Sequence, residues 1–217
     1  MLAQRMHELL LAYAETSAQE LSQLERYLEL LLRWNMRTNL TAVRDEEQIV
    51  RRHFGESLAI ARWIAERAGA ARTLFDLGSG AGFPGAVVAI ACPGLQVTLI
   101  ESQTKKAVFL KELVRTLELG NCRVHGGRAE ELLLQTDARQ NSARVERRAD
   151  LITMRAVDRS EEMLRVARSL MNDDGRVLFL AGERQSAPEL REEERVAGFG
   201  AVEESMLRGG VRVRVLN

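Results

Sequence analysis

The sequence predicts an α/β protein in which a doubly wound, Rossmann-like sheet follows an N-terminal helical extension. Three observations lead to this expectation. The first 70 residues show helical periodicity, short apolar segments alternate with helical patterns from residue 72, and a glycine-rich loop follows the first apolar segment. We therefore expect a helical extension over residues 1–70 and a ligand-binding domain over residues 71–217.

Leucines recur at steps of three and four residues between positions 21 and 32, which is typical of an amphipathic helix. Ser17 and Glu20 form a capping-box pattern at the start of this helix. The acidic residues 45–47 favour the first turn of a further helix, and another helix is expected from Glu56 to Ala68.

From residue 72 the pattern alternates between strands and helices. The expected strands cover residues 73–77, 96–100, 122–125, 150–154, 176–180, 201–202 and 211–216, with helices over 84–91 and 105–119. Such alternation is typical of βαβ units and a mainly parallel sheet. The polar segment 135–148 has no periodicity and is expected to form a long surface loop.

Composition limits the possible functions. The chain holds 31 basic and 31 acidic residues, so a nucleic-acid partner has to be bound by a local patch and not by bulk charge. Such a patch is suggested near the junction of the two parts by Arg33, Arg37, Arg44, Arg51 and Arg52. The sequence predicts neither a membrane span nor a secretion signal. The two cysteines, Cys92 and Cys122, are far apart, so we expect no disulfide framework and no zinc site. These features favour a cytoplasmic protein.

The loop with Gly78, Gly80 and Gly82 follows a buried strand, where glycine lets the backbone approach a ligand closely. A structural turn is the alternative. A nicotinamide-binding loop is another, because residues 80–85 match G-x-G-x-x-G and Glu101 lies 19 residues beyond Gly82. That match starts two residues late, and Pro84 has no N–H for a pyrophosphate. A P-loop is excluded because no Gly-Lys-Ser/Thr follows.

Three acids, Asp76, Glu101 and Glu130, follow or end successive strands, and a ring of carboxylates favours a ligand with a sulfonium, an ammonium and a ribose diol over a pyrophosphate. Glu101 can accept from both ribose hydroxyls, or it can pair with Lys105 or Lys106. Glu130 can accept from an adenine amino group, or it can be an acid at a helix start.

These residues resemble the class I S-adenosylmethionine methyltransferases, and more narrowly the bacterial 16S ribosomal RNA guanine-N7 methyltransferases of the glucose-inhibited division protein B family. The resemblance covers nearly the whole chain. It is seen in Trp34-Asn35, Asn39-Leu40-Thr41, Arg52-His53, Glu56-Ser57-Leu58, the segment from Asp76 to Gly85, Glu101-Ser102, Lys105-Lys106, Phe109-Leu110, the segment from Arg128 to Glu131, and Arg155-Ala156.

The resemblance implies a class I methyltransferase sheet over residues 71–217 that binds S-adenosylmethionine. Residue reasoning and resemblance together give the expected cofactor-binding residues as Gly78, Gly80, Phe83, Glu101, Ala129, Glu130 and Arg155. Glu101 stands where the family more often has Asp. Arg155 can contact cofactor or RNA, or it can pair with an acid such as Asp158.

The implied reaction is methylation of guanine N7 in 16S ribosomal RNA. N7 carries no proton, so we expect alignment in place of a general base, and we assign no catalytic residue. His53 is treated as structural. The alternatives are a methyltransferase of small molecules or proteins, a nicotinamide-dependent oxidoreductase, and a non-catalytic binding module. The neutral charge favours structured RNA or an assembling ribosomal particle as the partner, and no membrane.

Overall fold

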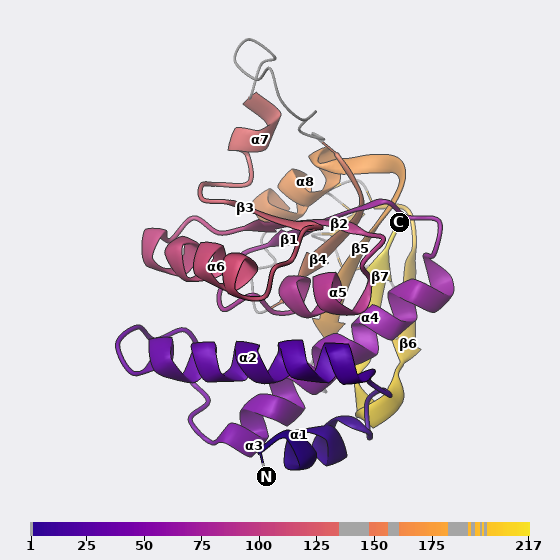
Figure 1. The fold of residues 1–217 in the computed structure, drawn as a ribbon. Coiled ribbons are helices and arrows are strands. Elements are labelled where there is room, and N and C mark those ends of the chain that lie inside the picture. The colour runs from indigo at the N-terminus through magenta and orange to yellow at the C-terminus, as the bar shows by residue number, and fades with distance from the viewer. Residues whose placement is uncertain are drawn as a thin grey trace.

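The computed structural model describes residues 2–134, 148–155, 161–181, 191, 194–195, 197 and 199–217 (Figure 1). Its described strands form one seven-stranded sheet in the order β3-β2-β1-β4-β5-β7-β6. These strands are β1 (Thr73–Leu77), β2 (Gln96–Ile100), β3 (Cys122–His125), β4 (Ala149–Met154), β5 (Met171–Ala181), β6 (Val202–Met206) and β7 (Arg212–Leu216). The α/β expectation is therefore confirmed.

The sheet is parallel from β3 to β5, whereas β7 pairs antiparallel with both β5 and β6. The chain runs outward from β1 to β3 and then returns to place β4 on the other side of β1. The strand order therefore reverses beside β1. Ligands of open α/β sheets bind at such a point, beyond the carboxyl ends of the strands.

Helices cover both faces of this sheet (Figure 1). In chain order they are α1 (Leu2–Leu10), α2 (Ala18–Asn35), α3 (Glu46–Ile49), α4 (Glu56–Arg67), α5 (Gly85–Ala91), α6 (Thr104–Thr116), α7 (Glu131–Leu134) and α8 (Glu161–Ser169). Leu74 of β1 packs in a core shared with α2, α4, α5 and α6, whereas Phe75 packs in a second core with α8. The alternation of side chains along β1 thus supplies both cores.

Helix α2 lies across α5 and α6 and forms a further layer on that face (Figure 1). The Gln23 side chain donates to the carbonyl of Leu117 at 3.1 Å, and the Trp34 indole donates to Glu112 at 3.1 Å. These two contacts make α2 antiparallel to α6. The end of α2 consequently lies beside the middle of α6 and points toward the carboxyl edge of the sheet, where α6 begins.

Most expected elements are confirmed, including the capping box of Ser17 and Glu20. The helix that begins after Asp45 is different from the expectation, because it continues as a π-helical turn over Val50–Gly55 and runs into α4. Strand β5 begins earlier than expected and β6 extends further. The boundary at residue 70 stays a prediction.

Some expectations fall partly outside the described residues: segment 135–147 of the predicted surface loop, Ala156 and Asp158. Both Cys92 and Cys122 are free, and Cys122 is buried. Among the helices that the structure describes, none has the length and apolar character needed to cross a bilayer.

Gly85 begins α5 where the helix lies against β1 and β2. A Cβ there would lie 2.5 Å from Cδ2 of Leu99 and 2.7 Å from the carboxylate of Asp76. We expect Gly85→Ala to lower the free energy of unfolding by about 1–3 kcal/mol, the usual cost of overpacking, as measured by urea unfolding. Gly120→Ala is the matched control, because no atom lies within 4 Å of its added Cβ. Equal stability of the two variants would contradict the close packing of α5.

Candidate functional site at the carboxyl edge of the sheet

The glycine-rich loop leaves β1 at the point where the strand order reverses. Gly78, Gly80 and Gly82 have φ values of 67°, 57° and 94°, which residues other than glycine rarely adopt. The backbone N–H groups of Gly78 and Ser79 both donate to the carbonyl of Ile100, at 2.9 and 3.0 Å. The loop is therefore bound to the end of β2 and forms a fixed turn.

Glu101 follows β2 and is 5% exposed. One carboxylate oxygen accepts from the N–H of Gly80 at 2.9 Å, and the other accepts from the N–H of Gln103 at 2.8 Å. In the described part of the chain it forms no ion pair with Lys105 or Lys106. A buried carboxylate thus lies directly against the glycine loop, where the sequence pattern places the ligand.

Asp76 lies in β1, two residues before the loop begins at Gly78. The residue is 1% exposed, and its carboxylate accepts from the Thr153 hydroxyl at 2.7 Å and from the N–H of Gly85 at 3.3 Å. Burial raises the pKa of Asp76 to about 6, although these hydrogen bonds oppose the shift. The expectation that Asp76 belongs to an acidic ring around the ligand is therefore corrected: this side chain joins β1, β4 and α5 inside the protein.

Ala129 and Glu130 lie after β3, just before α7. Ala129 is buried and packs in the core shared with α8, whereas Glu130 is half-buried. The carbonyl of Glu130 accepts from the N–H of Leu133 at 3.0 Å, so the residue belongs to the helix start, as one sequence interpretation held. Its carboxylate pairs with no cation in the described part of the chain.

Arg155 follows β4 and is joined to the N-terminal helices. Its Nη2 atom donates to the Glu56 carboxylate at 2.8 Å and to the carbonyl of Arg52. The sequence allowed an ion pair with Asp158, but the described partner lies 99 residues away. Its Nη1 atom is buried and has no hydrogen-bond partner among the described residues. Burial lowers the pKa of Arg155, and Glu56 opposes this shift.

Phe83 is 6% exposed and belongs to an aromatic cluster on the loop. Its ring is stacked on Tyr27 with centroids 5.0 Å apart, and it lies 5.1 Å from the ring of His53 and 5.0 Å from that of Phe54. Its side chain therefore faces the N-terminal helices. Tyr27 is not among the expected site residues, because its only signal in the sequence is its place among the leucines of α2.

His53 lies in the π-helical turn, between the loop and the segment after α2. Its Nε2 atom lies 2.7 Å from the Thr41 hydroxyl, and the Asn35 side chain accepts from the N–H groups of Leu40 and Thr41 at 2.9 and 3.2 Å. Burial, together with the charges of Arg155 and Arg52, lowers the pKa of His53 to about 4. The imidazole is therefore neutral at pH 7, and its structural role stays a prediction.

This pKa shift predicts a pH dependence of stability. An unfolded histidine titrates near 6.5, so between about pH 6.5 and 4 the unfolded chain binds a proton that folded His53 does not. His53 consequently removes stability as the pH falls. Asp76 acts in the opposite direction, because its raised pKa lets the folded state bind a proton first.

Between pH 7 and pH 5, we expect the free energy of unfolding of His53→Gln to fall by about 2 kcal/mol less than that of the unchanged protein, as measured by urea unfolding at each pH. Asp76 is present in both proteins, so its contribution cancels in this comparison. Parallel pH profiles would show that His53 takes up its proton in the folded state as readily as in the unfolded one.

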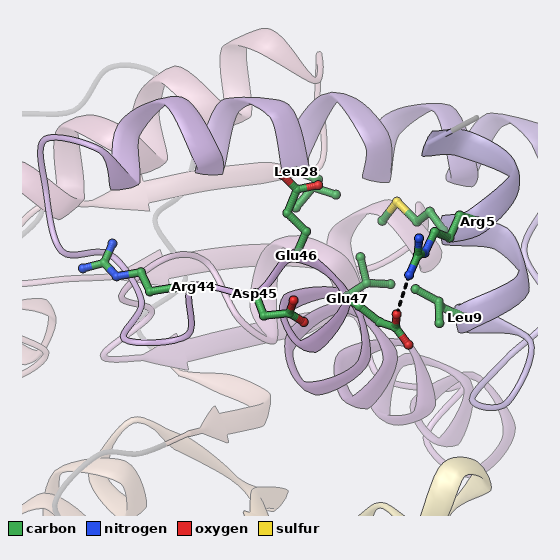
Figure 2. Close-up of a pocket in the computed structure, with 9 residues that line it drawn as sticks. Arg5, Leu9, Leu28, Arg44, Asp45, Glu46 and Glu47 are labelled. Carbon is green, nitrogen blue, oxygen red and sulfur yellow. Dashed lines mark hydrogen bonds and ion pairs between the residues drawn. The ribbon is translucent and has the colours of Figure 1, made fainter.

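A cavity of about 600 Å³ lies elsewhere, between α1, α2 and the start of α3 (Figure 2). Its apolar floor includes Leu9 and Leu28, and its rim includes Arg5 and Glu47, which form an ion pair at 2.8 Å. None of the expected site residues lines it. The expected residues are brought together at the carboxyl ends of β1 to β4, and this cavity belongs to the helical layer alone.

The sequence of this chain is similar to those of a known protein family. A family model described as rRNA small subunit methyltransferase G matches residues 20–214. The ribosomal RNA small subunit methyltransferase G of Stenotrophomonas maltophilia strain K279a is 45% identical over 157 residues, which are 72% of this chain and 66% of the relative. That of Chromobacterium violaceum is 39% identical over 168 residues, 77% of this chain and 73% of the relative. The match thus spans just under two thirds of the first of these relatives.

Solved structures agree on the fold. The mitomycin 7-O-methyltransferase MmcR has a TM-score of 0.57 and 24% identity, and the match covers 79% of this chain and 56% of that one. MtNAS, solved in complex with MTA and tNA, has a TM-score of 0.58 and 14% identity, with 90% of this chain and 70% of that one covered. With the strand order and the family match over residues 20–214, the conclusion is that this chain belongs to the rRNA small subunit methyltransferase G family.

Proposed function

We propose that this protein is a cytoplasmic enzyme that transfers a methyl group from S-adenosylmethionine to N7 of a guanine in 16S ribosomal RNA. The observation that carries the proposal is the contact between the Glu101 carboxylate and the N–H of Gly80, at 2.9 Å. It places negative charge against the loop that would otherwise bind phosphate.

The residues at the carboxyl edge fit this cofactor. A pyrophosphate on the loop would meet the Glu101 carboxylate, and the N–H of Gly80 is already bound to that carboxylate. A ribose diol instead donates to a carboxylate, and each oxygen of Glu101 keeps a lone pair for it. Glu130 carries a carboxylate without a cation among the described residues, which suits an amino group. Gly78 and Ala129 would let the ligand approach the backbone closely.

The bound cofactor supplies an electrophilic methyl group on a sulfonium. Guanine N7 already presents a lone pair, so this chain has only to orient the base and keep anions near the cationic donor. The buried groups agree with that role. Asp76 is bound to Thr153 and Gly85, and both ring nitrogens of His53 lie inside the protein. Its Nε2 atom contacts Thr41, and its Nδ1 atom is buried without a partner among the described residues, so we assign neither group as a general base.

Basic side chains at the same edge support RNA as the substrate. Arg33 and Arg37 lie at and just beyond the end of α2, and Lys105 and Lys106 lie in the first turn of the neighbouring α6. None of the four forms an ion pair within the described residues. Other arginines of the helical layer do, as Arg5 and Arg51 both bind Glu47. A protein without net charge therefore has unpaired cations beside the proposed cofactor site, where phosphates of an RNA could bind.

Methylation of a small molecule or a protein is the alternative, because the fold is shared with enzymes such as a mitomycin 7-O-methyltransferase. The unpaired cations favour RNA over that alternative. The absence of net charge also favours structured RNA inside an assembling ribosomal particle over naked RNA as the substrate. Methylation of protein-free 16S RNA at the full rate would contradict the particle as substrate.

The decisive experiment is deletion of the gene, followed by mass spectrometry of nuclease-digested 16S RNA. We expect the loss of one N7-methylguanosine, and its return when the unchanged gene is supplied on a plasmid. Supply of the Glu101→Ala gene should restore it only weakly, because cofactor binding is impaired. An unaltered modification profile in the deletion strain would refute the RNA assignment.

The position of Glu101 gives a binding prediction. Glu101→Ala removes the acceptor for the ribose hydroxyls, so we expect the binding free energy of S-adenosylmethionine to weaken by roughly 1.5–3 kcal/mol, the range for charged hydrogen bonds. Isothermal titration calorimetry measures this change. Glu29→Ala, which alters an exposed acid on α2, is the control. Unaltered affinity in Glu101→Ala would mean that the ribose lies elsewhere, and tight binding of NAD alone would favour the oxidoreductase.

A further inference from the structure

Tyr27 joins the N-terminal helices to the glycine loop. Its side chain, in the middle of α2, is completely buried, and its hydroxyl donates a hydrogen bond to the carbonyl of Ala81. Residues 27 and 81 are 54 positions apart in the chain. A helix outside the sheet therefore binds the backbone of the loop directly.

The Tyr27 hydroxyl is a permanent donor. Burial raises its pKa well above the ordinary value of 10.0, and Asp76 adds to this shift. The Tyr27 hydroxyl consequently stays protonated at neutral pH. If the hydroxyl were removed, the carbonyl of Ala81 would lose its described donor in a buried place, and such a group is costly to leave unbonded.

The ring of Tyr27 fixes the next part of the loop. It lies parallel to the ring of Phe83, with an interplanar angle of 5° and centroids 5.0 Å apart. Phe54 packs edge-on against both rings at 5.0 Å. One side chain thus binds residue 81 through its hydroxyl and residue 83 through its face.

Gly82, between these two residues, shows how close the approach is. A Cβ at this position would lie 2.5 Å from the Tyr27 hydroxyl, and the φ of 94° excludes most side chains as well. The glycine is therefore required both by the backbone angle and by the nearness of Tyr27. On the side of β2, the N–H of Gly80 donates to Glu101.

We propose that Tyr27 is a positioning residue for the cofactor: it orients the peptide groups of residues 80–82 from the side of α2, while Glu101 orients them from the side of β2. This inference rests on the proposed S-adenosylmethionine site. It assigns to a residue of the helical layer a part in cofactor affinity, although the expected cofactor contacts all come from residue 78 onward.

The test is Tyr27→Phe in the full chain, because this change removes the hydroxyl and keeps the stacked ring. By calorimetry we expect the dissociation constants of S-adenosylmethionine and S-adenosylhomocysteine to rise about five- to tenfold, the size of one lost hydrogen bond at the loop. In methylation of small ribosomal subunits, KM for the cofactor should rise while kcat changes little. Tyr13→Phe is the matched control, since it removes a hydroxyl from the same helical layer at a ring that packs on Gly55 and Gly209.

Hydrogen–deuterium exchange without cofactor provides a second measurement. Faster exchange confined to residues 78–83 in Tyr27→Phe, and absent from Tyr13→Phe, is the expected result of a loosened loop. A Tyr27→Phe protein that melts at a lower temperature but keeps the cofactor affinity and the exchange of the loop would show that Tyr27 only packs. If the unchanged protein itself fails to bind either cofactor form, the proposed function fails, and this outcome is distinct from a failure of Tyr27→Phe alone.

Discussion

The site depends on one charge-assisted hydrogen bond, between the carboxylate of Glu101 and the N–H of Gly80 at 2.9 Å. It decides the chemistry of the loop, because a backbone that would otherwise present N–H groups to a phosphate presents a buried acid. It also joins the ends of the two adjacent strands β1 and β2, whose last residues, Leu77 and Ile100, are in register. At the proposed cofactor site, one contact therefore accounts both for the geometry of the loop and for the proposed selection of a cationic ligand.

The helical layer and the sheet are connected throughout the site. The aromatic rings of α2 and the π-helical turn surround Phe83, and Glu56 at the start of α4 binds Arg155 at 2.8 Å. Two sides of the loop are thus contacted by different parts of the chain, one from the N-terminal helices and one from β2. The hydrophobic core shows the same connection, since residues of α2 and α4 share one cluster with β1 and α5.

The sequence predicted the elements whose signal is local. Strands 96–100 and 122–125 were found with their observed bounds because each is a short run between turn residues, and Ser17 and Glu20 identified the start of α2. The expected site residues all follow strands whose carboxyl ends meet at one edge. The ion pair of Arg155 with Glu56 could not be predicted, because packing alone brings together residues 99 positions apart. The burial of Asp76 was missed because a strand-end acid has the same pattern whether it faces a ligand or Thr153. Tyr27 was hidden because an aromatic residue on the apolar side of a helix signals packing first.

Helix α2 limits how freely the N-terminal helices of such a protein can be exchanged for those of a relative. Its middle supplies the tyrosine that contacts the loop, and its last turn carries Arg33 and brings Trp34 against Glu112 of α6. In the proposed function, this helix of 18 residues would therefore contact the cofactor loop with its middle and carry a cation for the RNA near its end. Exchange of these helices for those of a relative with a different target would change the fit of the loop together with the choice of target, so a chimera joined near residue 70 would need matching substitutions on both sides of the junction.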